Sequence, residues 1–371
     1  MPNLKTKEIK SPPSPVSPFA PAIIGWYQQH KRNLPWRHTQ DPYLIWLSEI
    51  ILQQTRVAQG MPYYYKFAEA FPTVYDLAQA SQQEVLRLWQ GLGYYSRARN
   101  LHACARIIVE QHGGKFPATY RELLSLKGIG TYTAAAIASF AYNETVPVVD
   151  GNVYRVLSRV FGVKDDILSP AGQKNFRQLA ETLVPEGEAH VYNQAIMEFG
   201  ALQCTPSSPA CLLCPVSTMC YAYQHGQQMA LPVKIKKTKV RKRYLHYLAL
   251  HDEDTWWMKR RSDKGIWAGL NDFYSIETDQ PQAWEALDDP LLNSLMVQQT
   301  ITLEDATPYK HQLTHQQLHV TFFRIHLKHT APLRALLEDN GLRAYSVEEV
   351  STLPKPILVD NYLHDQNILV D

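Results

Sequence analysis

The sequence has little net charge, no long apolar run and few cysteines. Its 371 residues carry a formal net charge of only +2, so a nucleic-acid partner is indicated only if Lys and Arg gather locally. No stretch approaches the ~20 apolar residues of a membrane span, and the N-terminus has no apolar segment typical of a secretory signal. We therefore expect a soluble cytoplasmic protein with no membrane partner.

Cysteine is scarce and unevenly placed. Four of the five cysteines fall within CTPSSPACLLCPVSTMC: Cys204, Cys211, Cys214 and Cys220. An odd number of cysteines in a reducing compartment argues against a disulfide framework and favours metal ligation. The spacing C-x6-C-x2-C-x5-C places one short pair inside a compact loop, which favours a 4Fe-4S cluster over zinc. Unligated structural thiols are the weaker alternative.

The length of the chain allows two domains or more. Residues 1–18 contain five prolines and little apolar surface, which predicts a flexible tail. Apolar residues at three-and-four spacing predict a mainly α domain over 19–225. Residues 226–242 are predicted to form a basic linker, and 243–371 a smaller α+β domain.

Individual segments carry these predictions. Helical spacing is found in PYLIWLSEIILQQTRVA, QQEVLRLWQGL, RARNLHACARIIVEQHG and TYTAAAIASFAY. In the C-terminal part, YLHYLAL, DEDT and WWMKRR are typical of strand, turn and strand, and LHVTFFRIHL of a further strand. The change from helical to strand texture supports two separate domains.

The segment LKGIGTYTA predicts a turn with Gly128 and Gly130 before a helix. Glycine adopts positive φ readily, so backbone amides can point outward at the helix start, where the dipole favours an anion such as a DNA phosphate. Such a hairpin grips the DNA backbone without sequence preference. A glycine helix cap between two packed helices is the structural alternative.

Two carboxyl groups are candidates for chemistry. Glu49 lies on a largely apolar face of the predicted helix, for which Asp41 is the N-cap, so its pKa should rise. Asp150 follows VPVV and precedes GNVYRVLSRVF, where it is expected to be an N-cap kept ionised by the helix dipole. One protonated and one ionised carboxyl group are what glycoside cleavage requires. A purely structural cap is the alternative for Asp150.

Residues 25–225 resemble the helix-hairpin-helix DNA glycosylase superfamily. The segments LPWR, WLSEIILQQT, GLGYYSRARN, LKGIGTYTA and VVDGNVYRV, with the cysteine loop, resemble in particular the MutY family of adenine DNA glycosylases. The resemblance implies base excision repair on double-stranded DNA containing A:8-oxoguanine or A:G mismatches. It also implies a bacterial, nucleoid-associated monomer, whose 4Fe-4S loop presents basic residues to DNA and takes no redox step.

The same resemblance implies roles for the residues that match the family's motifs. It makes Glu49 the acid that protonates adenine, and Asp150 the carboxylate that stabilises or traps the sugar cation, with support from Tyr132 and Asn152. The positions of the flipped adenine and of the duplex are implied by further matches: Arg37 and Glu198 hold the adenine, Gln53 and Tyr94 act as wedges, and Gln54 lies on the minor-groove side.

Tyr132 separates two branches of the superfamily. Endonuclease III, an oxidised-pyrimidine glycosylase/lyase, is similar but has at this position a lysine that forms a Schiff base. A phenol cannot do so, and we therefore expect a monofunctional glycosylase. The endonuclease III-like activity and a non-catalytic iron-sulfur DNA-binding or electron-transfer protein are the alternatives.

The C-terminal domain resembles the Nudix-like domain with which the family recognises 8-oxoguanine. Leu313, Thr314 and His315 match the family's Phe-Ser-His recognition loop, and only the histidine is kept. A solvated turn is the structural alternative for His315. No acidic helix with the Nudix hydrolase spacing follows GIWAGLNDFY, which disfavours a third alternative, a nucleotide hydrolase.

Overall fold

The computed structural model describes residues 18–235, 240–253, 255–262, 264–298, 301–328 and 331–369. Residues 1–17 of the predicted tail and 236–239 of the predicted linker lie outside the described residues. Among the helices of the described part, none is both long enough and apolar enough to span a bilayer.

The chain forms two compact units. The first runs to Ala78 and resumes at Ala103, and the second comprises Gln79–His102 together with the chain after the linker. This grouping differs from the predicted boundaries, which placed all of 19–225 in one domain. Residues 79–102 belong to the second unit through contacts such as Arg99 Nη1 to the carbonyl of Ala268, 2.8 Å, and Arg260 Nη2 to Gln82 Oε1, 2.8 Å.

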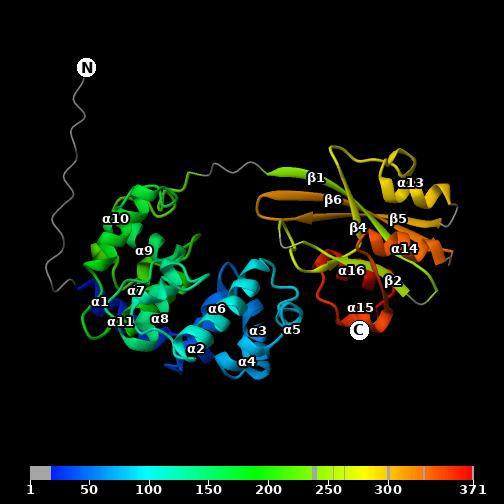
Figure 1. Ribbon diagram of the computed structural model, residues 1–371. Helices are drawn as coiled ribbons and strands as arrows, with labels where there is room; N and C mark the ends of the chain where they lie inside the picture. The colour runs from blue at the N-terminus through cyan, green and yellow to red at the C-terminus, as the bar shows by residue number, and fades with distance from the viewer. Residues whose placement is uncertain are drawn as a thin grey trace, which may run out of the picture. The chain divides into compact units, whose positions relative to one another are not determined.

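Helices build the chain up to the linker (Figure 1). They are α1 Phe19–His30, η1 Pro35–Arg37, α2 Pro42–Leu52, α3 Val57–Ala70, α4 Val74–Gln79, α5 Gln82–Leu88, α6 Ser96–His112, α7 Tyr120–Leu123, α8 Thr131–Tyr142, α9 Gly151–Phe161, α10 Pro170–Glu181, α11 Ala189–Leu202, η2 Cys211–Leu213, η3 Ser217–Met219 and α12 Tyr221–Gln224. The four segments for which we predicted helices coincide in large part with α2, α5, α6 and α8, which confirms those predictions.

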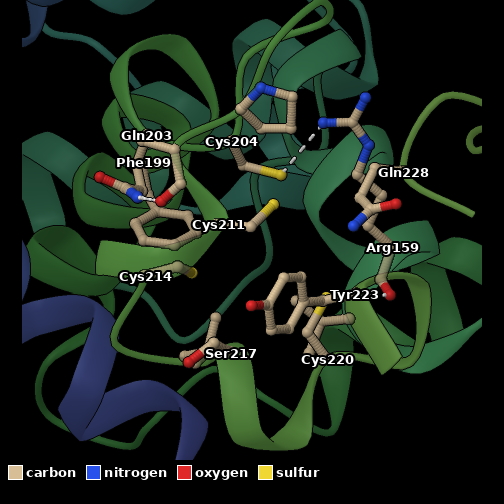
Figure 2. A pocket seen from close by; sticks show the side chains of 14 residues that line it. Arg159, Phe199, Gln203, Cys204, Cys211, Cys214, Ser217, Cys220, Tyr223 and Gln228 are labelled. Carbon is tan, nitrogen blue, oxygen red and sulfur yellow. Dashed lines mark hydrogen bonds between the residues drawn. The ribbon is translucent and has the colours of Figure 1, made fainter. Parts of the chain in front are cut away.

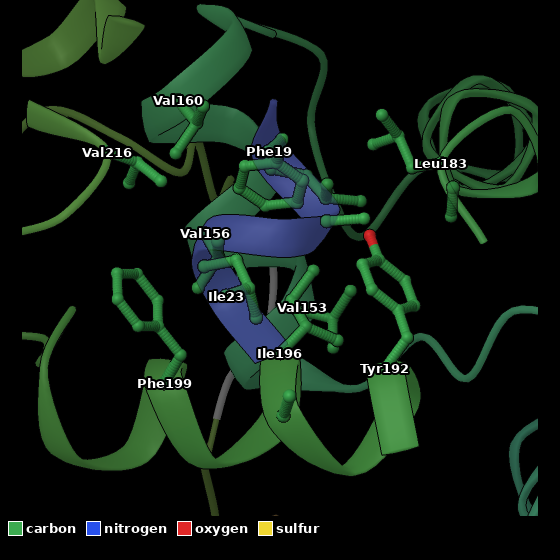
Figure 3. Close-up of a cluster of buried hydrophobic side chains, with 14 of the residues drawn as sticks. Phe19, Ile23, Val153, Val156, Val160, Leu183, Tyr192, Ile196, Phe199 and Val216 are labelled. Carbon is green, nitrogen blue, oxygen red and sulfur yellow. The ribbon is translucent and has the colours of Figure 1, made fainter. Parts of the chain in front are cut away.

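The core of the first unit forms where α1, α9 and α11 meet (Figure 3). Phe19 and Ile23 of α1 are fully buried against Val156 of α9 and Phe199 of α11. Burying each side chain of this size contributes about 1.5–3 kcal/mol. Val216, between η2 and η3, belongs to the same cluster, so the cysteine loop is anchored on the core that carries the start of α9.

The second unit contains a seven-stranded sheet covered by helices. Its elements after the linker are β1 Arg241–His251, β2 Thr255–Arg260, β3 Asn271–Asp272, β4 Tyr274–Thr278, η4 Trp284–Ala286, α13 Pro290–Val297, β5 Ile301–Gln312, β6 Gln316–Leu327, α14 Ala331–Asp339, β7 Arg343–Ser346, α15 Val347–Thr352 and α16 Ile357–Asp365. The strand order is β3-β2-β1-β6-β5, while β4 also pairs with β1 and β7 with β2.

The register of the sheet fixes the position of the predicted recognition loop. β1 and β6 are parallel, with Arg241 opposite Gln316, and β5 and β6 form an antiparallel hairpin. Residues 313–315 are the turn of that hairpin. The predicted strands at YLHYLAL, WWMKRR and LHVTFFRIHL are confirmed as parts of β1, β2 and β6. After GIWAGL the chain continues into β3 and β4, where a Nudix hydrolase would need its acidic helix.

Candidate active site

Glu49 is held inside the first unit by α2. As predicted, Asp41 caps this helix by accepting a hydrogen bond from the backbone N–H of Tyr43, 2.8 Å. Pro42 occupies the first helical position. Seven residues later, Glu49 lies on the buried face of α2 and is only 7% exposed. The cap therefore fixes the helix whose spacing carries the carboxyl group into the interior.

The Glu49 carboxyl group is poised to hold a proton near neutrality. Burial raises its pKa to about 7, the nearby Asp150 adds to the rise, and the hydrogen bond from Tyr132 opposes it. Tyr132 Oη donates to Glu49 Oε2 over 2.6 Å. Burial also raises the pKa of Tyr132 well above 10, so the phenol stays a donor. The expected rise in the pKa of Glu49 is thus confirmed.

Asp150 is the N-cap of α9, as predicted. Its Oδ1 accepts from the backbone N–H of Val153 and its Oδ2 from Asn152 Nδ2, each over 2.8 Å. Burial raises the pKa of Asp150, so desolvation acts against the ionised form that we expected the helix dipole to favour. The hydrogen bonds from Val153 and Asn152 and the charge of Arg155 oppose that rise and favour the carboxylate.

Arg155 connects this carboxylate to the cysteine loop. Its Nη2 donates to Asn152 Oδ1, 2.8 Å, and to the carbonyl of Gly200, 2.6 Å, while its Nε donates to the carbonyl of Cys204, 2.7 Å. These bonds orient the Asn152 amide so that its NH2 group faces Asp150. Gly200 permits the approach, since a Cβ there would lie 2.6 Å from the Cβ of Asn152. The part that Arg155 and Gly200 play in this arrangement could not be predicted from the sequence.

Glu198 is a paired anion. Both Arg32 and Arg37 bind it in bidentate fashion, with Arg32 Nη2 2.6 Å and Arg37 Nη2 2.8 Å from Glu198 Oε2. Although burial favours a higher value, the hydrogen bonds from Arg32 and Arg37 lower the pKa of Glu198 to about 2. Arg32 was missed by the sequence analysis, which had no pattern linking residues so far apart.

A pocket opens beside Glu49. It is lined by Trp36, Arg37, Ile45, Ser48, Glu49, Phe140, Gln194 and Met197. Arg37 therefore reaches the pocket and the Glu198 pair at once, with its guanidinium also 5.5 Å from the ring centre of Tyr27. Of the other wall residues, Trp36 falls in the motif LPWR and Ser48 in WLSEIILQQT. The wall also draws on α8 and α11, and no spacing in the sequence relates these helices to α2.

The predicted wedge residues at the end of α2 occupy a turn. Gln53 is the C-cap, and its Nε2 donates to Thr133 Oγ1 at the start of α8 over 3.0 Å. Gln54 has φ 56°, a left-handed conformation that is uncommon outside glycine. The hydrogen bond to α8 fixes the turn beside the Tyr132 end of the site.

The predicted hairpin joins α7 to α8. Gly128 has φ 81° and requires glycine, but Gly130 has φ −90° as the N-cap of α8, so the prediction of positive φ at both glycines was wrong for Gly130. A Cβ at Gly130 would meet nothing within 4 Å. The side-chain position of Gly130 is therefore not covered by the residues around it, and a ligand could approach the backbone there.

The four loop cysteines surround one cavity (Figure 2). Cys204, Cys211, Cys214 and Cys220 line it together with Arg159, and none is in a disulfide. Arg159 Nη1 lies 3.5 Å from Cys204 Sγ and 2.7 Å from the carbonyl of Thr205. Across the described ranges, no group of three or more His, Cys, Asp or Glu side chains is arranged to hold a metal ion.

One expectation for this loop was wrong. We expected it to present basic residues to DNA, yet 204–220 contains no Lys or Arg. Two of its large apolar side chains, Leu212 and Leu213, are 86% and 84% exposed. The only described cations at its cavity come from α9, where Arg159 faces inward to the loop carbonyls and not to solvent.

Tyr94 and the predicted recognition loop belong to the second unit. Tyr94 Oη and Thr314 Oγ1 share a hydrogen bond. Both line a cleft of about 630 Å³, together with Leu313 and His315 from the same turn and with Trp267. The backbone of the turn is fixed, because the Leu313 N–H donates to the Gln316 carbonyl, 2.8 Å, and the Arg241 N–H to the His315 carbonyl, 3.0 Å.

Comparison with known proteins matches two parts of the chain to families. Residues 47–186 match the HhH-GPD superfamily base excision DNA repair protein, and residues 246–365 match the NUDIX domain. The chain is 35% identical over 261 residues to the adenine DNA glycosylase of Buchnera aphidicola subsp. Schizaphis graminum, covering 70% of this chain and 75% of the relative.

Two further similarities bear on the helical part. The adenine DNA glycosylase of Mus musculus is 45% identical over 229 residues, which cover 58% of this chain and 44% of the mouse protein. A solved structure described as a thermostable thymine-DNA glycosylase superposes with TM-score 0.51 at 32% identity, over 56% of this chain and 95% of that one. The helical fold is therefore that of a DNA glycosylase domain, and the C-terminal unit is Nudix-like.

Proposed function

The chain belongs to the adenine DNA glycosylase family, and on that premise we propose that it hydrolyses the N-glycosidic bond of adenine paired with 8-oxoguanine or guanine. The single observation that carries the mechanism is the pair of unlike carboxyl groups, Glu49 with a pKa of about 7 and Asp150 capping α9. One is suited to give a proton and the other to stabilise a cation.

In this mechanism the target adenine leaves the base stack and enters the pocket beside Glu49. Glu49 protonates the base at N7, and the C1′–N9 bond breaks with its electron pair going to adenine. Asp150 then stabilises the sugar cation at C1′. Water adds at C1′ and gives up a proton to a carboxylate, which leaves an abasic site and free adenine. Tyr132 and Asn152 hold the two carboxyl groups in place.

The proposal includes a monofunctional reaction. Of the described residues that line the pocket beside Glu49, none is a lysine, and Tyr132 offers a hydroxyl group already bonded to Glu49. A lyase needs an amine to form a Schiff base with the abasic sugar. The open backbone at Gly130, at the N-terminus of α8, further supports contact with a DNA phosphate.

The test is an incision assay on three duplexes, carrying A opposite 8-oxoguanine, A opposite G, and an oxidised pyrimidine. We expect strand breaks at adenine in the first two duplexes, and only after alkali. Breaks without alkali would show a lyase. Binding without any breaks would show a non-catalytic DNA-binding protein, and cleavage of the oxidised-pyrimidine strand would favour the endonuclease III-like alternative.

We also propose that the four loop cysteines hold a 4Fe-4S cluster. A zinc ion needs its thiolates within about 2.3 Å of one metal, whereas the thiolates of a cubane bind different irons and stand farther apart. Four free cysteines around a common cavity suit the larger group. Cys204, Cys211, Cys214 and Cys220 would be its ligands, and when bound it would cross-link the loop without entering the reaction.

Cys214→Ser should therefore lose iron and destabilise the loop, because the side chains of 204–220 offer little apolar surface with which to fold without a cluster. We expect DNA affinity to fall by roughly tenfold or more. Iron and sulfide content, thermal unfolding and DNA binding are the measurements. Cys104→Ala, which alters the buried cysteine outside the loop, is the matched control and should keep its iron. Normal DNA binding by an iron-free Cys214→Ser protein would contradict the structural role.

Recognition of 8-oxoguanine is proposed for the turn 313–315. 8-Oxoguanine differs from guanine at N7–H and O8, so discrimination needs an acceptor and a donor at that edge. The Thr314 hydroxyl and the His315 imidazole offer both, on a turn whose backbone is hydrogen-bonded on either side. Both residues are exposed at the cleft that also contains Tyr94.

The double variant Thr314→Ala with His315→Ala should lower the preference for A:8-oxoguanine over A:G by roughly 30-fold, since two lost contacts of about 1 kcal/mol each are removed. The rate on A:G should change little. Single-turnover rates on both mismatches at fixed salt measure the ratio. Thr302→Ala with His326→Ala, a cross-strand pair at the other end of the same hairpin, is the control. An unchanged ratio would place lesion recognition elsewhere.

A further inference from the structure

The turn between α5 and α6 holds Tyr94 in an uncommon conformation. Three residues within GLGYY have left-handed backbone: Gly91 at φ 94°, Gly93 at φ 73° and Tyr94 at φ 50°. Glycine adopts such angles without strain, but an aromatic residue does so only when its surroundings hold it there. Tyr94 is also 47% exposed, so its ring projects from the surface instead of being fixed in a core.

Arg97 packs against this turn from the first part of α6. Its guanidinium carbon lies 5.5 Å from the ring centre of Tyr94 and 5.1 Å from that of the buried Trp89. A guanidinium stacks on aromatic faces and keeps its donors free to bind at its edge. Burial lowers the pKa of Arg97 to about 10, so the group stays charged at neutral pH.

Trp89 and Arg97 also form hydrogen bonds with the backbone of this turn. Trp89 Nε1 donates to the Gly93 carbonyl over 2.9 Å, and Arg97 Nη2 lies 3.3 Å from that oxygen. The Arg97 N–H donates to the Tyr94 carbonyl over 2.8 Å. Arg97 therefore contacts Tyr94 on both its ring and its backbone, and links it to a side chain with no exposed surface.

We propose that Arg97 is the positioning residue that keeps Tyr94 ready to enter the base stack. This inference rests on the proposed function, in which Tyr94 is a wedge that fills the space left by the flipped adenine. A wedge that is fixed before DNA binds loses less conformational entropy on insertion. Without the Arg97 side chain, the ring of Tyr94 would lose a stacking contact and would rely on the hydrogen bond that its hydroxyl group shares with Thr314.

The test measures base flipping and excision in the intact protein. 2-Aminopurine replaces the target adenine opposite 8-oxoguanine, and its fluorescence reports unstacking on binding. Arg97→Met keeps an unbranched side chain but removes the cation and its plane, and should reduce both the fluorescence rise and the single-turnover excision rate by about tenfold. Arg97→Lys keeps the charge without the plane and should fall between Arg97→Met and the wild type.

A double-mutant cycle shows whether Arg97 acts through Tyr94. Tyr94→Ala should lose at least as much as Arg97→Met, and the double variant should be no worse than Tyr94→Ala alone. Flanking mismatches that pre-open the target pair should restore most of the rate to Arg97→Met, whereas a general folding defect would persist. Arg106→Met, an exposed arginine of α6 paired with Glu110, is the control and should match the wild type.

The outcomes separate this inference from the function on which it rests. A wild-type protein that neither flips nor excises the base would overturn the proposed function itself. Normal excision by Tyr94→Ala would show that Tyr94 is not a wedge, and the inference about Arg97 would then be wrong. If wild type and Tyr94→Ala behave as expected, then full activity of Arg97→Lys, or losses that multiply in the double variant, would show that Arg97 does not position Tyr94.

Discussion

Glu49→Gln should abolish excision of adenine while leaving mismatch binding nearly unchanged. The amide keeps the shape of the side chain and can still accept the hydrogen bond from Tyr132, but it has no proton to give. Removal of a general acid costs about 10²–10⁴ in rate. Single-turnover excision on A:8-oxoguanine and the dissociation constant for the same duplex are the two measurements, and a loss confined to the first is the expected result.

The pH profile checks the same assignment without a mutation. The acid form of Glu49 prevails below its pKa of about 7, so the wild-type rate should fall as the pH rises through that value. At low pH the rate should fall again as Asp150 takes up a proton. This fall should begin at a higher pH than for an ordinary aspartate, because burial raises the pKa of Asp150. Glu110→Gln, which alters an exposed carboxylate of α6, should retain the wild-type rate and profile. Excision by Glu49→Gln near the wild-type rate would refute the assignment.

Asp150→Asn should lose about 10²–10³ in excision rate, because it removes the charge that stabilises the sugar cation. The fold should survive. Asparagine is as good an N-cap as aspartate, and its amide oxygen can keep the bond from the Val153 N–H that Oδ1 now accepts. A single-turnover assay beside a thermal melt distinguishes lost chemistry from lost structure.

The control for Asp150→Asn is a second N-cap carboxylate. Asp289 caps α13 by accepting from the backbone N–H groups of Leu291 and Leu292, so Asp289→Asn makes the same chemical change at another helix start. Its excision rate should equal that of the wild type. If Asp150→Asn unfolds while Asp289→Asn does not, the charge at Asp150 is structural and the proposed catalytic role fails.

Several site residues could be predicted because their signals are local. The cap at Asp41, the spacing along α2 and the burial of Glu49 all follow from one stretch of helix. The cap at Asp150 likewise needs only the residues on either side. Its pKa could not be predicted from the cap alone, since the desolvation that raises it comes from the surrounding fold.

Other residues have no signal that the sequence alone could provide. The bond from Arg155 to the Cys204 carbonyl spans 49 positions, and that from Arg32 to Glu198 spans 166. No helical or strand periodicity relates such pairs, because they meet only when α1, α9 and α11 pack together. The division of the chain into units could not be predicted for the same reason. Residues 79–102 group with the C-terminal unit through side-chain contacts between residues that are far apart in the sequence.

The sequence by itself determined the helices and strands, the two family resemblances, the pair of carboxyl groups and the cysteine spacing, because each depends on neighbouring residues or on short motifs. Only the tertiary structure decided how the site is supported. It placed Arg155 between Asn152 and the cysteine loop, and stacked Arg97 on Tyr94. The physical reason is that burial and long-range hydrogen bonds set the pKa and the orientation of a side chain, and both exist only in the packed fold.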